Sequence, residues 1–140
     1  MIVYFFGQPG SGKTTLAKEF VSWRGESYFP FNECCIIDGD HMREIFKDQN
    51  YSKAGRVRNI QRAMDIILYE HYIEEPVFCS LVTPYNFQRI WLQQQGEQVL
   101  FIYLTYNIAD NRGKELFHIN DFDPPSGLQN LLELNTSELT

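Results

Sequence analysis

The sequence predicts an α/β fold of three layers, with a mainly parallel five-stranded sheet and helices on both of its faces. Three observations lead to this fold class. Strand-like and helix-like segments alternate along all 140 residues. The strand-like runs are apolar at consecutive positions, which is typical of strands buried on both faces. A glycine-rich loop directly follows the first run, residues 2–6, and leads straight into a helical pattern. Such alternation indicates parallel strands joined by right-handed helical crossovers.

The first half of the chain has a clear signal for each element. After the first strand, apolar residues at helical spacing predict a helix over residues 14–21, and Gly25 is a candidate cap for its C-terminal end. An apolar run that ends in a carboxylate predicts the second strand over residues 34–38. A short helix is expected over residues 42–47. The longest helical pattern follows over residues 55–74, where apolar residues recur at intervals of three and four.

The second half repeats the alternation of strand and helix. Pro76 ends the long helix, and a third strand is expected over residues 77–82. The remaining elements are a helix over residues 87–95, a strand over 99–104, a helix over 107–117 and a shorter fifth strand over 131–134. Residues 135–138 have the pattern of an N-terminal cap, but no helix follows them. We therefore expect the end of the sheet either to be exposed or to be covered by a partner.

Length and composition indicate one domain over residues 1–140. The net charge of −6 argues against general binding to nucleic acid or to a membrane surface, because both need a basic face. No signal peptide or membrane span is expected. Cys34, Cys35 and Cys79 are odd in number and stand in apolar runs, which is typical of reduced core thiols in a cytoplasmic protein.

The glycine-rich loop fits the phosphate-binding pattern GxxxxGK[ST]. Its backbone N–H groups and the following helix N-terminus can surround phosphate oxygens. Lys13 is expected to reach the outer phosphates of ATP, and the Thr14 hydroxyl is the expected Mg²⁺ ligand. The alternative is a glycine-rich turn with a chance lysine. The residues expected to bind the nucleotide here are Gly7, Gln8, Pro9, Gly10, Ser11, Gly12, Lys13, Thr14 and Thr15.

Two carboxylates and an arginine follow the second predicted strand. Asp38 and Asp40 lie within one turn of its end, and Arg43 comes three residues later. A kinase needs a carboxylate to accept the proton of the acceptor hydroxyl, and an arginine to hold the acceptor's anionic group. Asp40 is the expected base, with Asp38 supporting the metal through water. The alternative is that both aspartates cap the helix at Met42.

The long helix carries Arg56, Asn59 and Arg62 at intervals of three, so these residues line one of its faces. A solvated face would explain this spacing equally well. With Arg43 they would form a basic pocket in an acidic protein, which suits an anionic small molecule. Ser80 stands in the third strand where a phosphate-loop protein often carries an Asp on the metal side.

Together these motifs resemble the adenylylsulfate kinase family of P-loop kinases. GQPGSGKTT resembles the family's phosphate loop, IIDGDHMR its strand ending in DGD followed by Arg, and GRVRNIQR its substrate helix. Tyr51 and Ser52 stand where an aromatic residue followed by Ser precedes that helix. SLVTPY followed by Arg89 resembles the segment after the third strand. The resemblance covers nearly the whole chain.

This resemblance implies a P-loop NTPase fold and a kinase that uses MgATP to phosphorylate the 3′-hydroxyl of adenylylsulfate in sulfate assimilation. Arg43, Arg56 and Asn59 would hold the phosphosulfate, and Tyr51 would stack on the adenine. Arg112 would bind the nucleotide, and Lys114 would belong to a mobile lid over the phosphates. The substrate contacts implied by position are Asp40, Arg43, Tyr51, Arg56, Asn59, Ser80, Leu81, Val82 and Lys114.

Two departures from the family's pattern leave alternatives open. The lid, at about residues 112–125, is shortened, and the terminal helix is missing. The acceptor could therefore be another nucleotide, a nucleoside or a nucleic-acid base, since a scaffold does not fix its substrate. A nucleotide-binding module with little turnover is the third interpretation. A homodimer is possible.

Overall fold

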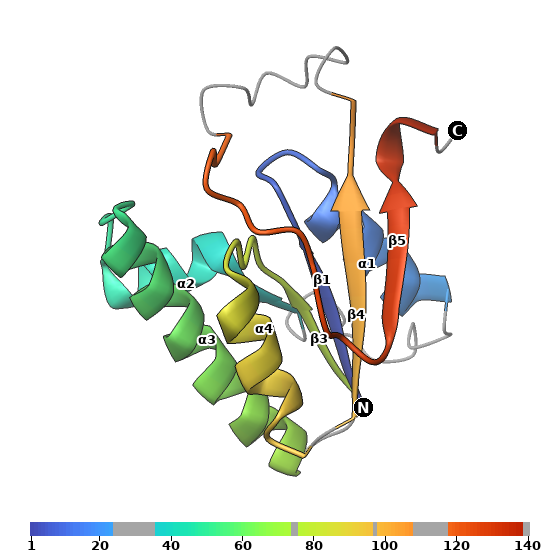
Figure 1. The fold of residues 1–140 in the computed structure, drawn as a ribbon. Helices are drawn as coiled ribbons and strands as arrows, with labels where there is room; N and C mark the ends of the chain where they lie inside the picture. Colours follow the sequence, from blue (N-terminus) through green and yellow to red (C-terminus); the bar gives the residue numbers. More distant parts are fainter. Residues whose placement is uncertain (24–35, 74–75, 97, 108–117, 139–140) are drawn as a thin grey trace.

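Five parallel strands form one sheet with helices on both faces in the computed structural model, which describes residues 1–23, 36–73, 76–96, 98–107 and 118–138 (Figure 1). Their order across the sheet is β2-β3-β1-β4-β5, and every pairing is parallel. The elements are β1 (Ile2–Gly7), α1 (Lys13–Trp23), β2 (Ile36–Asp38), α2 (Gly39–Phe46), α3 (Lys53–Ile73), β3 (Val77–Ser80), α4 (Asn86–Gln93), β4 (Val99–Thr105), β5 (Leu131–Asn135) and the 3₁₀ turn η5 (Thr136–Glu138). The predicted α/β class is confirmed.

The central strand β1 explains why the strand-like runs are apolar at every position. Side chains of Tyr4 and Phe6 pack into the core beneath α3 and α4, while those of Val3 and Phe5 pack against α1 on the opposite face. Figure 1 shows α3 and α4 on one side of the sheet and α1 on the other. Because successive side chains of a strand point to opposite faces, a strand covered on both sides needs apolar residues throughout.

The predicted strands and helices are found where the structure describes them, with shifted ends. The second helix starts at Gly39 rather than residue 42, because Asp38 caps it. The third strand ends at Ser80 rather than residue 82, and the chain turns at Thr83, whose φ of 44° is unusual for a β-branched residue. The predicted cap at Gly25, residues Cys34 and Cys35, and residues 108–117 of the predicted helix at 107–117 lie outside the described residues.

The far edge of the sheet is formed by β5, where Leu131 and Leu132 are partly exposed. A hydrogen bond from the Thr136 hydroxyl to the Thr105 carbonyl oxygen ties η5 to the end of β4. Cys79 is a free thiol buried in the core, and burial raises its pKa. None of the described helices has the length and apolar character needed to span a bilayer.

Candidate active site

A cleft of about 680 Å³ opens at the carboxyl ends of β1, β2 and β3. This is the edge at which ligands bind in open parallel sheets. The loop after β1, the start of α2, the first turns of α3 and the segment after β3 all contribute to it. Its lining residues are Pro9, Gly10, Gly12, Lys13, Thr14, Thr15, Asp38, Gly39, Asp40, Arg43, Tyr51, Arg56, Asn59, Ile60, Ser80, Val82, Pro84, His118 and Ile119.

The loop between β1 and α1, which we call the donor loop, holds a buried cation. Lys13 is only 9% exposed, and its Nζ donates a hydrogen bond of 2.9 Å to the backbone oxygen of Gln8. Burial lowers the pKa of Lys13 to about 8, although Asp38 and Asp40 act in the opposite direction. A buried ammonium without a carboxylate in direct contact is a position prepared for an anionic ligand.

The backbone of the donor loop leaves room for phosphate oxygens. At Gly7 a Cβ would lie 2.4 Å from the backbone oxygen of Leu104, so no larger residue fits beside β4 there. Gly12 has a φ of 93°, a conformation that other residues rarely adopt. The Ser11 hydroxyl is buried and has no hydrogen-bond partner in the part of the chain described.

Three oxygen atoms meet below the donor loop. Thr14 Oγ1 donates to Asp38 Oδ2 at 2.8 Å and lies 2.9 Å from Ser80 Oγ. Asp38 Oδ1 accepts from the backbone N–H of Asp40 at 2.8 Å, so Asp38 is also the N-terminal cap of α2. The capping interpretation is thus confirmed for Asp38, and its role beside a metal stays a prediction. Such oxygen ligands suit Mg²⁺ held partly through water.

No cluster of three His, Cys, Asp or Glu side chains that could enclose a metal occurs among the described residues.

The opposite wall of the cleft carries buried polar groups. Arg43 is 8% exposed, and its Nη1 donates to the backbone oxygens of Asp48 and Asn50 at 3.0 and 3.1 Å. Its guanidinium lies 3.9 Å from the ring centre of Tyr51, a side chain that is 58% exposed. Asn59 is 3% exposed, and its Oδ1 has no partner within the described segments. Arg43 and Asn59 thus offer oriented polar groups to a second ligand.

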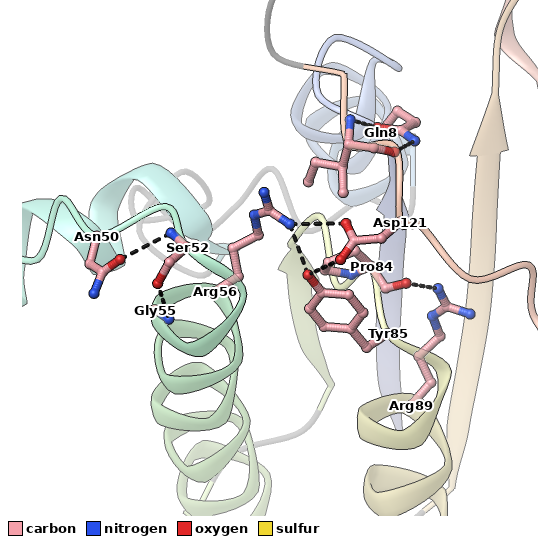
Figure 2. Close-up of polar contacts among 10 residues, drawn as sticks. Gln8, Asn50, Ser52, Gly55, Arg56, Pro84, Tyr85, Arg89 and Asp121 are labelled. Carbon is pink, nitrogen blue, oxygen red and sulfur yellow. Dashed lines mark hydrogen bonds and ion pairs between the residues drawn. The ribbon is translucent and has the colours of Figure 1, made fainter.

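Arg56, the second arginine of this wall, is held by residues that do not line the cleft. Arg56 Nη1 donates to the Tyr85 hydroxyl at 2.8 Å and to Asp121 Oδ1 at 3.1 Å, and the Tyr85 hydroxyl donates to Asp121 Oδ2 at 2.9 Å (Figure 2). The hydrogen bond from Tyr85 is the main cause of the lowered pKa of Asp121. Tyr85 and Asp121 were not among the site residues predicted from the sequence. The only sequence signal at Asp121 was its place in an Asp- and Pro-rich loop.

Some predicted site residues lie elsewhere or are not described. Arg62 does not line the cleft, because it pairs with Asp48 at 3.0 Å together with Arg58. The side chain of Leu81 is fully buried in the core, whereas its neighbours Ser80 and Val82 reach the cleft. Gly7, Gln8 and Ser11 belong to the donor loop but do not line the cleft. Arg112 and Lys114, and with them residues 112–117 of the predicted lid at 112–125, lie outside the described residues.

Comparison with known proteins agrees with this geometry. A family model described as adenylylsulphate kinase matches residues 1–115. The chain belongs to the adenylylsulphate kinase family. The resemblance found in the sequence motifs is thereby confirmed, and the donor loop, the Asp38–Asp40 pair and α3 all fall within the matched part of this family member.

Two relatives and one solved structure illustrate the likeness. This adenylylsulphate kinase family member is 28% identical over 114 residues to an adenylyl-sulfate kinase of Pseudomonas entomophila, which covers 77% of the chain and 52% of the relative. It is 33% identical over 89 residues to an adenylyl-sulfate kinase of Chloroflexus aurantiacus, which covers 61% of the chain and 45% of the relative. The chain thus spans about half the length of the curated relatives it matches.

The solved structure is the Mycobacterium tuberculosis APS kinase CysC in complex with AMPPNP and APS. The TM-score is 0.69 at 18% identity, with 96% of this chain and 87% of that chain covered. At this level of identity, the likeness supports the P-loop kinase fold of the chain.

Proposed function

We propose that this chain transfers the γ-phosphoryl group of MgATP to the 3′-hydroxyl of adenylylsulfate, giving 3′-phosphoadenylylsulfate and ADP. The observation that carries the proposal is a single cleft with a buried cation on each wall, Lys13 on one and Arg43 on the other. The wall with Arg43 also holds Asn59 Oδ1, a buried polar atom without a hydrogen-bond partner among the described residues. A two-substrate kinase needs such a pair of anion sites facing one reaction space.

The donor loop is the ATP side of this proposal. Lys13 would exchange its contact with the Gln8 carbonyl for an outer phosphate oxygen. Thr14, with Asp38 and Ser80 beside it, would hold Mg²⁺. Bound Mg²⁺ supplies neutralisation of the charge that develops on the transferred phosphoryl group.

The acceptor side consists of Arg43, Arg56, Asn59 and Tyr51. The arginines and Asn59 would fix the phosphosulfate by hydrogen bonds, because a guanidinium matches the geometry of an anionic oxygen pair. Arg43 covers one face of the Tyr51 ring. The other face would stack on the adenine, since the Tyr51 side chain is largely exposed. Asp40 is an exposed carboxylate of the first turn of α2 and would accept the proton of the 3′-hydroxyl.

Turnover with a panel of acceptors tests the proposed reaction. The protein is incubated with MgATP and either adenylylsulfate, nucleoside monophosphates, nucleosides or oligonucleotides, and ADP release is followed. We expect release with adenylylsulfate, and its loss in Lys13→Ala because the outer phosphates lose their cation. ADP release with a different acceptor, and none with adenylylsulfate, would show that this other acceptor is the substrate. ATP binding without release for any acceptor would make the chain a nucleotide-binding module, and unchanged turnover in Lys13→Ala would overturn the donor-loop assignment.

Asp40→Asn separates the role of a base from that of a nucleotide ligand. We expect kcat to fall about a hundredfold or more, because a positioned base contributes at least that factor. The dissociation constant for ATP should remain nearly unchanged. Asp65→Asn is the matched control, since Asp65 is an exposed carboxylate of α3 that contacts Gln61 away from the cleft. Equal losses of kcat and nucleotide affinity in Asp40→Asn would reassign Asp40 to the metal or to the fold.

Three further properties belong to this proposal. We infer one kinase domain over residues 1–140 with a shortened lid, a cytoplasmic location, and a homodimer. The partly exposed Leu131 and Leu132 on the edge strand β5 support the dimer. Light scattering coupled to size-exclusion chromatography measures its mass, and a monomer at every concentration would exclude it.

A further inference from the structure

Residues 118–123, which we call the strap, connect the two walls of the cleft. His118 and Ile119 line the cleft beside the donor loop. A few residues on, Asp121 contacts Arg56, and Asp123 contacts Arg89. In Figure 2 the Asp121 carboxylate points toward Arg56 and Tyr85, and Gln8 is drawn above them. The strap therefore contacts the side of the cleft proposed to bind ATP and also Arg56, which is proposed to bind the acceptor.

Gln8 attaches the strap to the donor loop with both ends of its side-chain amide. Its Nε2 donates to the backbone oxygen of Ile119 at 2.8 Å, and its Oε1 accepts from the backbone N–H of Ile119 at 2.9 Å. Two bonds to one residue fix the position of the strap along the loop. The backbone oxygen of Gln8 also accepts from Lys13 Nζ at 2.9 Å. One residue thus contacts both the phosphate-binding cation and the strap.

At the other end, the strap orients Arg56. Asp121 and Tyr85 hold Nη1 of the guanidinium, and neither residue lines the cleft. Nε and Nη2 of Arg56 have no protein partner in the described portion of the chain. A guanidinium held at one nitrogen keeps its plane and presents its remaining donors to an anion.

The strap is also fixed where it leaves the cleft. The backbone N–H of Asp123 donates to the Pro84 oxygen at 2.8 Å, and its backbone oxygen accepts from Arg89 Nη2 at 2.7 Å. Arg89 is fully buried. With this end anchored in the core, a shift of the donor loop reaches Asp121 through Gln8 and Ile119.

We propose that Gln8 is a positioning residue that couples nucleotide binding in the donor loop to the orientation of Arg56. The inference rests on the proposed function, because that proposal assigns Arg56 to the acceptor. Phosphate groups draw Lys13 Nζ away from the Gln8 carbonyl, and this changes the contacts of the residue that holds the strap. The strap then determines the position of Asp121. Asp121 in turn determines the orientation of the Arg56 guanidinium, which faces the acceptor's anionic group.

Gln8→Leu tests the coupling, and Gln93→Leu is its matched control. Gln93 makes the same kind of contact elsewhere, donating to the Gly127 oxygen at 3.0 Å and accepting from the Gln129 N–H at 2.8 Å. Both variants are neutral and lose two hydrogen bonds. We expect Gln8→Leu to raise the KM for adenylylsulfate at saturating MgATP about tenfold and to leave the dissociation constant for ATP without acceptor within about twofold. Gln93→Leu should change neither value.

Hydrogen–deuterium exchange of the strap tests the coupling without any acceptor. In the wild type and in Gln93→Leu, the magnesium complex of the non-hydrolysable ATP analogue AMPPNP should slow amide exchange in residues 118–123. In Gln8→Leu the analogue should bind without slowing it. Equal slowing in Gln8→Leu and the wild type would overturn the proposal, whether or not adenylylsulfate is the acceptor. Failure of the proposed reaction is seen separately, as wild-type protein that releases no ADP.

Tyr85→Phe provides a second variant if Gln8→Leu does not fold. It removes the hydroxyl that links Arg56 to Asp121 while leaving the charge unchanged. We expect a raised KM for adenylylsulfate with exchange protection of the strap retained. Because Asp121 also contacts Arg56 directly at 3.1 Å, Asp121→Ala is measured beside it. An unchanged KM in Asp121→Ala would show that the strap does not orient Arg56, which would also overturn the proposal.

Discussion

Lys13 shows how a residue proposed to bind phosphate can lower the stability of the protein that carries it. Burial lowers its pKa from 10.5 to about 8, so the folded state holds this proton less tightly than the unfolded chain. Between these two pH values the unfolded chain binds more protons, and stability therefore rises with pH. Below about pH 8 the protein carries the full cost of a buried charge.

Lys13→Met should therefore stabilise the protein while removing its activity. At pH 7 we expect a gain of up to about 3 kcal/mol in the free energy of unfolding, at 1.36 kcal/mol for each unit of pKa shift. The wild type should gain stability between pH 8 and pH 10, and the variant should not. Denaturant titrations across this range measure the difference. Lys18→Met, which removes an exposed lysine from the same helix, is the control. If the free energy of unfolding changed with pH in the same way in the wild type and in Lys13→Met, the explanation by a buried charge would be contradicted.

On the cleft wall opposite the donor loop, the sequence revealed only some of the residues that make up the site. Arg43, Arg56 and Asn59 could be picked out by charge, spacing and motif. Tyr85 and Asp121, which hold Arg56, could not, because they come from two distant loops that only the folded chain brings together. Arg62 continues the spacing of Arg56 and Asn59 but turns to Asp48, since three residues advance a helix by less than one full turn. Each step of three therefore rotates the side chains further around α3.

At the scale of elements, the loop before α3 depends on a glycine inside that helix. A Cβ on Gly55 would lie 2.1 Å from the backbone oxygen of Asn50. The same oxygen accepts a hydrogen bond from Arg43. The start of α3 and the arginine of α2 are thus held by one close backbone contact.

Gly55→Ala should destabilise the protein, although the same change in an ordinary helix interior is stabilising by about 1 kcal/mol. We expect a loss of about 1–3 kcal/mol because the new methyl group overlaps the Asn50 backbone. The KM for the acceptor should rise as Arg43 loses its anchor. Thermal unfolding and steady-state kinetics measure both effects. Gly39→Ala is the control for stability, since its Cβ would meet Leu81 Cδ2 at an ordinary 3.6 Å. A more stable Gly55→Ala would show that the Asn50 loop is free to move.

Element ends were harder to predict than the elements themselves. Apolar runs and helical spacing located the strands and helices, because burial on both faces leaves a strong pattern in the sequence. Ends depend on single contacts instead. Asp38 starts α2 early by capping it, and the bonds of the Lys47 backbone N–H to the Arg43 and Glu44 oxygens end it at Phe46. Neither contact has a pattern that extends over several residues.

At the scale of the whole molecule, alternation of strand and helix was enough to predict a parallel sheet with both faces covered. It could not give the order β2-β3-β1-β4-β5, since strand order depends on which edges pair after folding. That order puts the ends of β1, β2 and β3 side by side, and so brings the donor loop, Asp38 and Ser80 together. The site is in this sense a consequence of topology: Thr14, Asp38 and Ser80 are far apart in sequence and within hydrogen-bonding distance in space.

The central place of β1 has a consequence for synthesis on the ribosome. Chains emerge from the N-terminal side, at about 5–20 residues per second. The segment IVYFFG of β1 therefore waits for its neighbours, because β3 comes from residues 77–80 and β4 from residues 99–105. During this interval an uncharged strand of high β-propensity has no partner, which is the kind of segment that chaperones shield and that aggregates when they do not. The strand that later carries the donor loop is thus also the part of the nascent chain most in need of protection.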